Sequence, residues 1–253
     1  MVSLKNQEQL KLMKEAGRIT GEALVVARDL VKEGVSTKFL DKKIREHIEK
    51  CGAKPSFLGY GGFPASACIS VNHQVIHGIP SENVILKEGD LVKIDVGACY
   101  RGWHGDAART FAVGRVSKEA ELLMTTTKES FFRGVALALA NNRVGDIGSA
   151  VDACARSQGF SVVRQFVGHG VGKELHEDPE VPNYGREGHG VRLYPGMTLA
   201  IEPMVNAGKS GVRVLGDGWT VVTEDGSLSA HYENTVVITE EEPILLTDVG
   251  YGL

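Results

Sequence analysis

The amino-acid sequence predicts an α+β fold in which two similar halves bring their strands together around one shared site. The order of elements supports this prediction, because a long helix, a shorter helix, loops and strands occur before Ser117 and again after it. A matched stretch supports it as well, since 89–95 and 196–202 each contain a glycine, an apolar strand and a final carboxylate. Asp95 and Glu202 therefore occupy equivalent positions in the two halves.

Two further features repeat in the same order. Each half has a His-Gly-aliphatic tetrapeptide, which begins at His77 in the first half and at His169 in the second. Each half also has a second carboxylate that opens the next predicted strand, Asp106 and Glu233. Because several matches in one order are not expected by chance, we expect a single domain over 1–253 with no internal linker. Its two halves are about 1–116 and about 117–253.

Length and composition agree with one large domain. The chain has 253 residues, of which 42% are apolar and 24% charged, and this ordinary mixture excludes wholesale disorder. The net charge of −4 gives no electrostatic footprint for nucleic acid, and no apolar run approaches the roughly 20 residues that span a bilayer. No signal peptide is visible, and the four cysteines form no C-x-x-C pair. We expect a cytoplasmic protein without membrane or nucleic-acid partners.

Helices are predicted where apolar residues recur at helical spacing and capping residues mark the ends. Ser36 or Thr37 is a suitable N-cap for the second helix and Gly52 follows its end, while Ser117 precedes the third helix and Gly159 stops the fourth. Strands are predicted from short apolar runs bounded by glycine and turn residues. The predicted helices are 7–31, 37–50, 118–140 and 147–158, and the main predicted strands are 67–71, 91–96, 107–113, 198–201, 220–223 and 234–238.

Four carboxylates are the strongest functional signal. Asp95 and Asp106 flank a hairpin-like connection, so antiparallel pairing brings both to one face, and the repeat places Glu202 and Glu233 in the other half. A lone aspartate at a strand end is more often a turn or cap residue, but four converging carboxylates repel one another and lose hydration. Two divalent ions balance the four negative charges, and carboxylates bridge ions about 3.5–4 Å apart in two-metal hydrolases. The spacing therefore predicts a dinuclear metal site.

Histidines add a second signal. The segment 168–177 combines closely spaced glycines with His169 and His176, and it matches neither a phosphate-binding loop nor a dinucleotide fingerprint. One histidine among carboxylates favours Mn²⁺, Fe²⁺ or Co²⁺, with Zn²⁺ also compatible. His77 alone fits a core position equally well, but its equivalence to His169 favours a functional role. The remaining histidines are interpreted as surface or structural residues: His47, His73, His104, His189 and His231.

Four apolar side chains lie beside loops rich in glycine or proline, where such side chains often line pockets. They are Tyr60, Phe63, Cys68 and Trp219. Taken one at a time, each fits a core position better than a pocket position.

With these residues in view, the chain resembles the type I methionine aminopeptidases of the pita-bread family, peptidase family M24, in their short bacterial form. The resemblance covers about 14–247. The motifs that carry it are Ile94-Asp95-Val96-Gly97, Gly105-Asp106-Ala107-Ala108-Arg109-Thr110, Gly168-His169-Gly170-Val171-Gly172, Ile201-Glu202-Pro203-Met204 and Glu233 before a strand. It implies the pita-bread fold, with helices outside two halves related by a pseudo-twofold axis.

The resemblance also implies the site in detail. Two divalent ions are expected on five ligands, Asp95, Asp106, His169, Glu202 and Glu233. The activity is co-translational removal of the N-terminal methionine, preferably before a small second residue, by attack of a metal-held hydroxide on the first peptide bond. Glu202 is expected to move the proton, His176 to stabilise the oxyanion, and His77 to hydrogen-bond the scissile amide. The methionine pocket is expected to consist of Phe57, Tyr60, Phe63, Cys68, Leu175 and Trp219.

Partners follow from the same resemblance. The expected substrate is the N-terminal methionine of nascent polypeptides at the ribosome, and the expected state is a monomer. A monovalent cation is expected near Asn72, Gln74 and Ser229. The pocket departs from the common family pattern at Gly61, Phe57 and Leu175, which bears on the preference for the second residue.

Two alternatives are considered. An X-Pro aminopeptidase or prolidase shares the fold and a similar dinuclear site, but such chains usually carry an additional N-terminal domain and further histidines near the site. A non-enzymatic pita-bread module that binds peptides is marked by a replaced ligand, and none of the five is replaced here.

Overall fold

The computed structural model describes residues 2–250, so Met1 and 251–253 of the expected domain lie outside the described residues. Within them, the helices are α1 (Gln7–Leu30), α2 (Thr37–Lys50), α3 (Lys118–Val135) and α4 (Val144–Ser157), with a short 3-10 helix at Tyr60–Gly62. The strands of the first half are β1 (Lys54–Pro55), β2 (Ala67–Val71), β3 (Gln74–Ile76), β4 (Leu91–Tyr100) and β5 (Trp103–Ala112). Those of the second half are β6 (Ser161–Val162), β7 (Gly168–Gly170), β8 (Glu177–Val181), β9 (Thr198–Ile201), β10 (Met204–Asn206), β11 (Val212–Val214), β12 (Val221–Thr223), β13 (Ser229–His231), β14 (Asn234–Val237) and β15 (Ile244–Leu245).

The helices begin and end where local capping is available. The α2 helix coincides with the predicted range, and the Ser36 side chain accepts a hydrogen bond from the backbone N–H of Phe39. The α3 helix ends at Val135, earlier than predicted. The α4 helix starts at Val144 rather than near Ile147, because the Asp146 carboxylate accepts from the backbone N–H of Arg143 and completes the first turn.

The hairpin of β4 and β5 differs from the prediction. Both strands are longer than expected, and only Arg101 and Gly102 lie between the paired residues Tyr100 and Trp103. These two residues have φ values of 50° and 80°, as a two-residue hairpin turn of type I′ requires. Asp106 therefore lies inside β5 instead of opening a strand, and neither aspartate borders the turn.

Every strand pairing in the described residues is antiparallel. The first half contains a sheet in which β4 pairs with β1, β2 and β5. The second half contributes a five-stranded sheet in the order β15-β14-β9-β7-β8 and a smaller sheet in the order β13-β10-β6. In a fourth sheet, of three strands, β12 of the second half pairs with β11 and with β3 of the first half. Strands from the two halves thus pair within one sheet.

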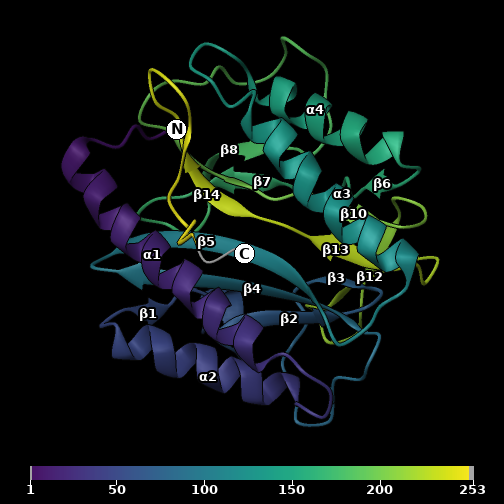
Figure 1. Cartoon of the computed structure of the whole chain (residues 1–253). Coiled ribbons are helices and arrows are strands. Elements are labelled where there is room, and N and C mark those ends of the chain that lie inside the picture. Colours follow the sequence, from purple (N-terminus) through teal and green to yellow (C-terminus); the bar gives the residue numbers. More distant parts are fainter. Residues whose placement is uncertain (1, 251–253) are drawn as a thin grey trace.

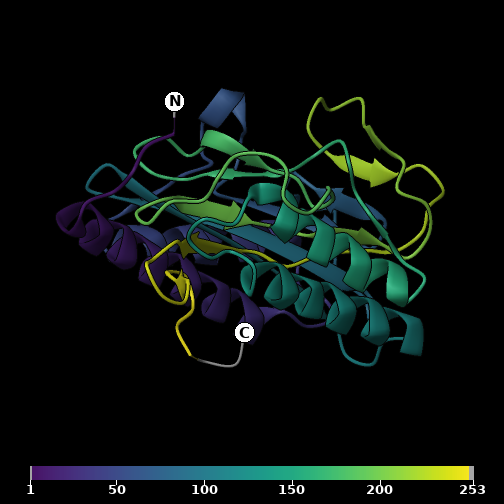
Figure 2. The same ribbon diagram turned by 90° about the horizontal axis from the view of Figure 1, so that it is seen from above.

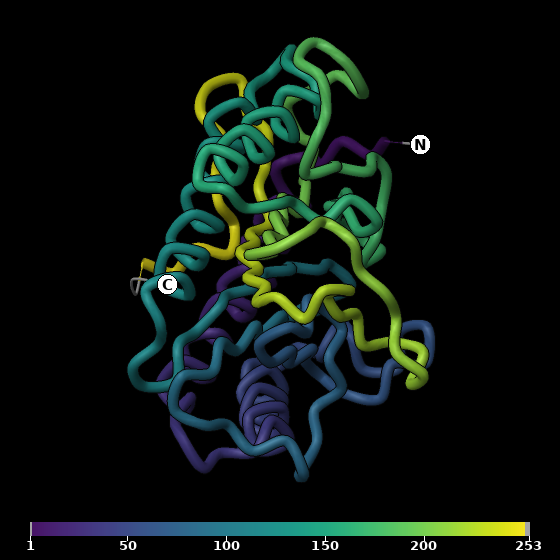
Figure 3. The backbone as a smooth tube through the Cα atoms, turned by 90° about the vertical axis from the view of Figure 1, so that its right-hand side faces the viewer, coloured from purple at the N-terminus to yellow at the C-terminus, as the bar shows by residue number. Residues whose placement is uncertain are grey.

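The helices lie on the outside of these sheets. In Figure 1, α1 and α2 accompany the long strands β4 and β5, whereas α3 and α4 accompany the strands of the second half. Figure 2 shows the helices along one side of the strands and irregular loops along the other. In the tube of Figure 3, most of the purple and blue first half lies below the green and yellow second half, while the purple N-terminal segment runs beside the green chain. The predicted α+β class, with antiparallel strands inside and helices outside, is confirmed.

Each half has its own large apolar core. One core joins α1 and α2 to β2, β4 and β5, and includes Leu24, Ile44 and Ile94, all completely buried. The other joins α3 and α4 to the second-half strands and includes Phe131 and Leu199. No helix in residues 2–250 combines the length and the apolar character needed to cross a membrane.

Candidate active site and metal centre

One cavity, with a volume of about 180 Å³, lies between the two halves. All thirteen of the predicted site residues line it, and three further residues, Ile76, Phe166 and Val167, complete the wall. The thirteen are Phe57, Tyr60, Phe63, Cys68, His77, Asp95, Asp106, His169, Leu175, His176, Glu202, Trp219 and Glu233. The fold therefore brings together the residues that the sequence analysis singled out, although they are spread from position 57 to 233.

The register of β4 and β5 brings the two aspartates together. Asp95 is opposite Ala108, and Asp106 is opposite Gly97, so the aspartates are diagonal neighbours on one face of the hairpin. Asp106 is 4% exposed, and its backbone N–H donates to the Thr235 hydroxyl of β14 at 2.9 Å. The same hydroxyl donates to the Asp106 carbonyl at 2.9 Å, which ties β5 to the second half.

The two glutamates lie at neighbouring strand ends in the second half. Glu202 directly follows β9 and Glu233 directly precedes β14, and these strands pair through Ile201 and Asn234. The backbone N–H of Glu233 donates to the Ala108 carbonyl at 2.9 Å. Consequently both glutamates face the β4–β5 hairpin across the boundary between the halves.

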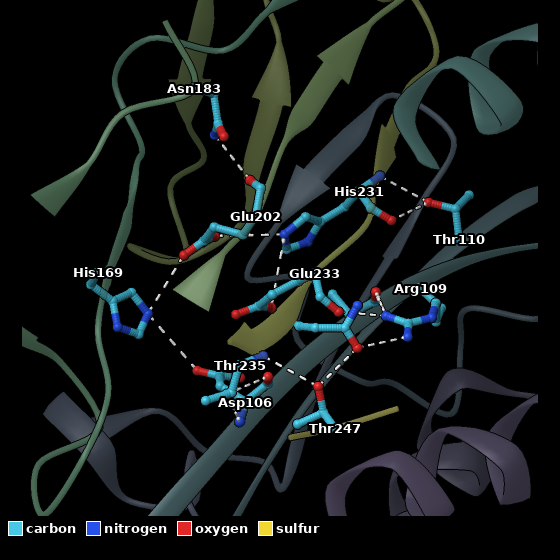
Figure 4. Close-up of polar contacts among 12 residues, drawn as sticks. Asp106, Arg109, Thr110, His169, Asn183, Glu202, His231, Glu233, Thr235 and Thr247 are labelled. Atoms are coloured by element: carbon cyan, nitrogen blue, oxygen red, sulfur yellow. Dashed lines mark hydrogen bonds and ion pairs between the residues drawn. The ribbon is translucent and has the colours of Figure 1, made fainter. Parts of the chain in front are cut away.

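Arg109 connects the two halves at this boundary through contacts of its side chain. Its guanidinium is buried, stacks over the Tyr232 ring at 4.0 Å and donates to the Asn234 side chain at 2.9 Å. It also donates to the carbonyls of Ala108 and Glu233 (Figure 4). Arg109 thereby fixes the backbone that carries the candidate ligand Glu233, as outer-shell groups do in metal sites.

His169 is oriented by its own backbone neighbour. Its Nδ1 lies 2.8 Å from the Gly170 carbonyl, which only accepts, so Nδ1 carries the proton and Nε2 presents its lone pair to the site. Nε2 lies 3.5 Å from Glu202 Oε1 and 3.9 Å from Asp106 Oδ2. This arrangement suits a metal-binding imidazole.

His231 was interpreted as a surface or structural residue, and the surface alternative is wrong. The side chain is 1% exposed, and its Nε2 lies 3.6 Å from Glu202 Oε2 and 4.0 Å from Glu233 Oε2 (Figure 4). Neither ring nitrogen has a hydrogen-bond partner among the described residues. The signal that identifies it is its place two residues before Glu233, since alternate residues of an extended chain point the same way.

The carboxylates of the cavity are buried close together, an arrangement that a bound cation would stabilise. Burial and the neighbouring carboxylates raise the pKa values of Asp95 and Glu233, and burial raises that of Asp106 to about 7 in the metal-free chain. In the part of the chain that the structure describes, one buried oxygen of each of these three side chains has no hydrogen-bond partner. Unpartnered carboxylate oxygens beside an oriented imidazole fit divalent metal ions. The donor set is therefore compatible with the expected metal.

His77 and His176 both line the cavity, each against a different aromatic neighbour. The ring of His176 has its centroid 4.0 Å from that of His169, and its Nδ1 lies 2.7 Å from the Tyr60 hydroxyl. His77 meets Phe166 and Trp219 edge-on, with ring centroids 5.8 and 6.3 Å apart. Burial lowers the pKa of His77 to about 4, so this imidazole is neutral near pH 7.

The remaining wall is apolar. Phe57, Phe63, Cys68 and Leu175 are buried and pack together, and Trp219 meets Phe63 edge-on at 5.1 Å. Cys68 on β2 is paired with Asp95, so the apolar wall directly adjoins the carboxylates. Burial and the Asp95 charge raise the pKa of the Cys68 thiol, which keeps it neutral and apolar in character.

The site expected for a monovalent cation lies elsewhere. Asn72, Gln74 and Ser229 are not among the residues that line the cavity. They belong to the β2–β3 turn, to β3 and to β13, and the Ser229 N–H donates to the Asn72 carbonyl at 3.2 Å.

With the geometry described, comparisons with known proteins assign the class. The model of metallopeptidase family M24 matches residues 11–240, and the chain belongs to this family. The family and the metallopeptidase class expected from the motifs are confirmed, and membership implies a divalent metal.

Relatives within the family are more specific. A methionine aminopeptidase of Clostridium perfringens is 56% identical over 247 residues, which cover 98% of this chain and 99% of that protein. The crystal structure of a methionine aminopeptidase from Thermotoga maritima superposes with a TM-score of 0.97 at 43% identity, covering 98% of this chain and all of the other. A prolidase from Pyrococcus furiosus superposes less closely, with a TM-score of 0.79 at 25% identity, and this chain covers 65% of it.

Proposed function

We propose that the chain removes the N-terminal methionine from proteins and peptides, preferably when the second residue is small. The observation that carries the proposal is the direct contact between an apolar, sulfur-containing wall and a cluster of buried carboxylates and His169 in one cavity. A methionine side chain suits the first surface, and peptide-bond hydrolysis suits the second. The full-length similarity to methionine aminopeptidases supports the same activity.

The metal centre in this proposal consists of two divalent ions held by Asp95, Asp106, His169, Glu202 and Glu233. By the resemblance to the family, Asp106 and Glu233 would be shared by the two ions, whereas Asp95 would serve one ion and His169 with Glu202 the other. When bound, the ions supply Lewis-acid polarisation of the scissile carbonyl and increase the acidity of water. Mn²⁺, Fe²⁺, Co²⁺ and Zn²⁺ all suit this oxygen-rich donor set.

Three side chains act on the reacting atoms. Glu202 is a buried carboxylate of raised pKa, which lets it accept a proton and deliver it to the leaving amine. Tyr60 holds Nδ1 of His176, which leaves Nε2 for the developing oxyanion. His77 is neutral near pH 7, so it acts on the scissile amide as a hydrogen-bond partner without adding charge.

The finer proposals concern context. The substrates are nascent polypeptides at the ribosome in the cytoplasm, and the chain acts as a monomeric single domain. Restriction to small second residues follows, in this proposal, from a tight wall beyond the methionine pocket, whose own lining includes the buried Phe57 and Leu175.

The test is initial-rate release of the first residue from Met-Ala-Ser, Met-Trp-Ser and Leu-Pro-Ala. Each peptide is assayed with Mn²⁺, with Co²⁺ and after chelation. We expect metal-dependent release of methionine from Met-Ala-Ser and little release from the other two. His176→Ala should lower the rate, whereas His189→Ala, at an exposed histidine, should not. Preferred cleavage of Leu-Pro-Ala would move the chain to the X-Pro enzymes, and no cleavage by folded, metal-loaded protein would favour a peptide-binding module.

A further inference from the structure

Lys93 is a completely buried lysine that the proposed reaction does not use. It lies inside β4, is 1% exposed, and ranks among the largest fully buried side chains of the described residues. Its amino group donates to the backbone carbonyl of Asn72 at 2.6 Å. A long side chain that ends in such a polar group is seldom buried unless the group has a structural task.

The acceptor of Lys93 is a junction between three parts of the chain. Asn72 occupies the β2–β3 turn with a φ of 53°. Its side chain accepts from the Leu91 N–H at 2.9 Å and donates to the Asp90 carboxylate at 2.8 Å. Its carbonyl accepts from the Ser229 N–H at 3.2 Å, and Ser229 opens β13, the strand that carries His231. The junction therefore links the turn and the start of β4 to the rear of the metal centre.

A monovalent cation does not fit this junction. A carbonyl oxygen has two lone pairs, and on Asn72 one is directed to the Lys93 amino group and the other to the Ser229 N–H. A cation coordinated by the Asn72 carbonyl would have to displace the lysine nitrogen from a space closed to solvent. This occupancy does not depend on whether the amino group is charged or neutral.

We propose that the Lys93 amino group permanently occupies the place of a bound monovalent cation at the Asn72–Ser229 junction, which makes this chain independent of Na⁺ and K⁺. The Lys93 nitrogen belongs to the chain itself, so its contact with the Asn72 carbonyl does not require the binding of an ion from solution. The junction therefore forms at any salt composition. The inference goes beyond the proposed activity, because it concerns how β13 is held.

The first test uses the unmodified chain. Thermal unfolding and methionine release are measured in NaCl, KCl and tetramethylammonium chloride at one ionic strength, with the divalent metal held constant. We expect the same unfolding midpoint and the same rate in all three salts. A rise of the midpoint, or a saturable rise of the rate, with the concentration of Na⁺ or K⁺ would overturn the proposal. The unfolding measurement is informative even if the proposed peptidase activity is wrong.

Two variants sharpen the test. Lys93→Ser opens the space beside the Asn72 carbonyl, whereas Lys93→Met fills it with an apolar group of similar length. In tetramethylammonium chloride we expect both midpoints to fall by about 5 °C or more. Added K⁺ or Na⁺ should restore at least half of the loss in Lys93→Ser and none in Lys93→Met. Lys87→Ser, on the loop before β4, is the matched control and should respond to neither change. Equal behaviour of the two Lys93 variants toward K⁺ and Na⁺ would contradict the proposal.

Discussion

At the scale of single residues, the site depends on polar atoms that are oriented before any ligand arrives. The Gly170 carbonyl selects the tautomer of His169, and the Tyr60 hydroxyl fixes one nitrogen of His176. Such preorganisation reduces the reorganisation that the reaction requires. The ring centroids of His169 and His176 are 4.0 Å apart, so a rotation of one ring changes the space available to the other.

The Tyr60 contact leads to the first prediction. Tyr60→Phe removes the hydroxyl that lies 2.7 Å from His176 Nδ1 but keeps the ring. Because a hydrogen bond of this kind contributes about 1 kcal/mol, we expect kcat for Met-Ala-Ser to fall roughly five- to tenfold. Metal affinity measured by calorimetry should stay the same. Tyr100→Phe, at the β4–β5 turn, is the control, and an unchanged kcat in Tyr60→Phe would contradict this role of the hydroxyl.

His77 leads to a prediction about pH. Its pKa is about 4 in the folded chain, against about 6.5 when unfolded, so between these values the unfolded chain binds the proton. Stability must therefore decrease as the pH falls from 6.5 to 4, by up to about 3 kcal/mol from this residue. His77→Asn, which tolerates the φ of 58°, should flatten that part of the profile. Denaturant unfolding of both metal-free proteins measures the difference, and parallel profiles would refute it.

At the scale of elements, the close packing of α1 against the β4–β5 hairpin positions the strand that carries Asp106. A Cβ on Gly105 would lie 2.8 Å from the backbone of Gly17 on α1, so glycine at position 105 allows this close contact, whereas a Cβ on Gly17 would meet the backbone of Leu246. Thr20 fastens the same crossing, because its hydroxyl donates to the Gly105 carbonyl at 3.1 Å and accepts from the Ala98 N–H at 3.2 Å. Asp106, the next residue, is positioned by this contact.

Gly105→Ala tests this crossing. The added methyl group meets backbone and cannot be accommodated by a rotamer change, so we expect a loss of about 1–3 kcal/mol in the free energy of unfolding. Gly216→Ala is the matched control, because its added methyl group would have no atom within 4 Å and its φ is not in the left-handed region. Urea unfolding of the metal-free proteins compares them. Equal stability of the two variants would show that α1 can move away without cost.

Elements also show what the sequence could predict. The helices and the long strands were predicted because caps and periodicity are local signals, and α2 and β2 match to the residue. Strands of two or three residues such as β6 and β13 were missed, since only their pairing with β10 makes them strands. The extension of β4 and β5 depends on Arg101 adopting a positive φ, which its residue type does not signal. The position of His231 beside the cavity carboxylates was not predicted, because His231 lies in β13 and that strand was not predicted either.

At the scale of the whole molecule, the candidate metal centre lies at the boundary between the two halves. Asp95 and Asp106 come from the first half, and His169, Glu202 and Glu233 from the second. Without cations, four buried carboxylates repel one another across this boundary, as their raised pKa values express. Metal ions reverse the sign of that interaction, so the site that hydrolyses peptides in our proposal also joins the halves.

The last prediction follows from this reversal. Mn²⁺ or Co²⁺ at about a hundredfold excess over its Kd should stabilise the chelated protein by about 2.7 kcal/mol, seen as a rise of the calorimetric unfolding midpoint that grows with the logarithm of metal concentration at pH 7.5. Asp106→Asn keeps the shape of the side chain but removes one buried negative charge. The metal-free variant should therefore be more stable than the metal-free natural chain, yet gain much less from metal. The order of stability of the two proteins is therefore reversed when metal is added. Without metal, repulsion among the carboxylates limits the stability of the natural chain. With metal, the missing ligand limits the stability of the variant. A variant that is less stable than the natural chain in both states would show that Asp106 supports the fold independently of the metal, and the repulsion argument would then be wrong.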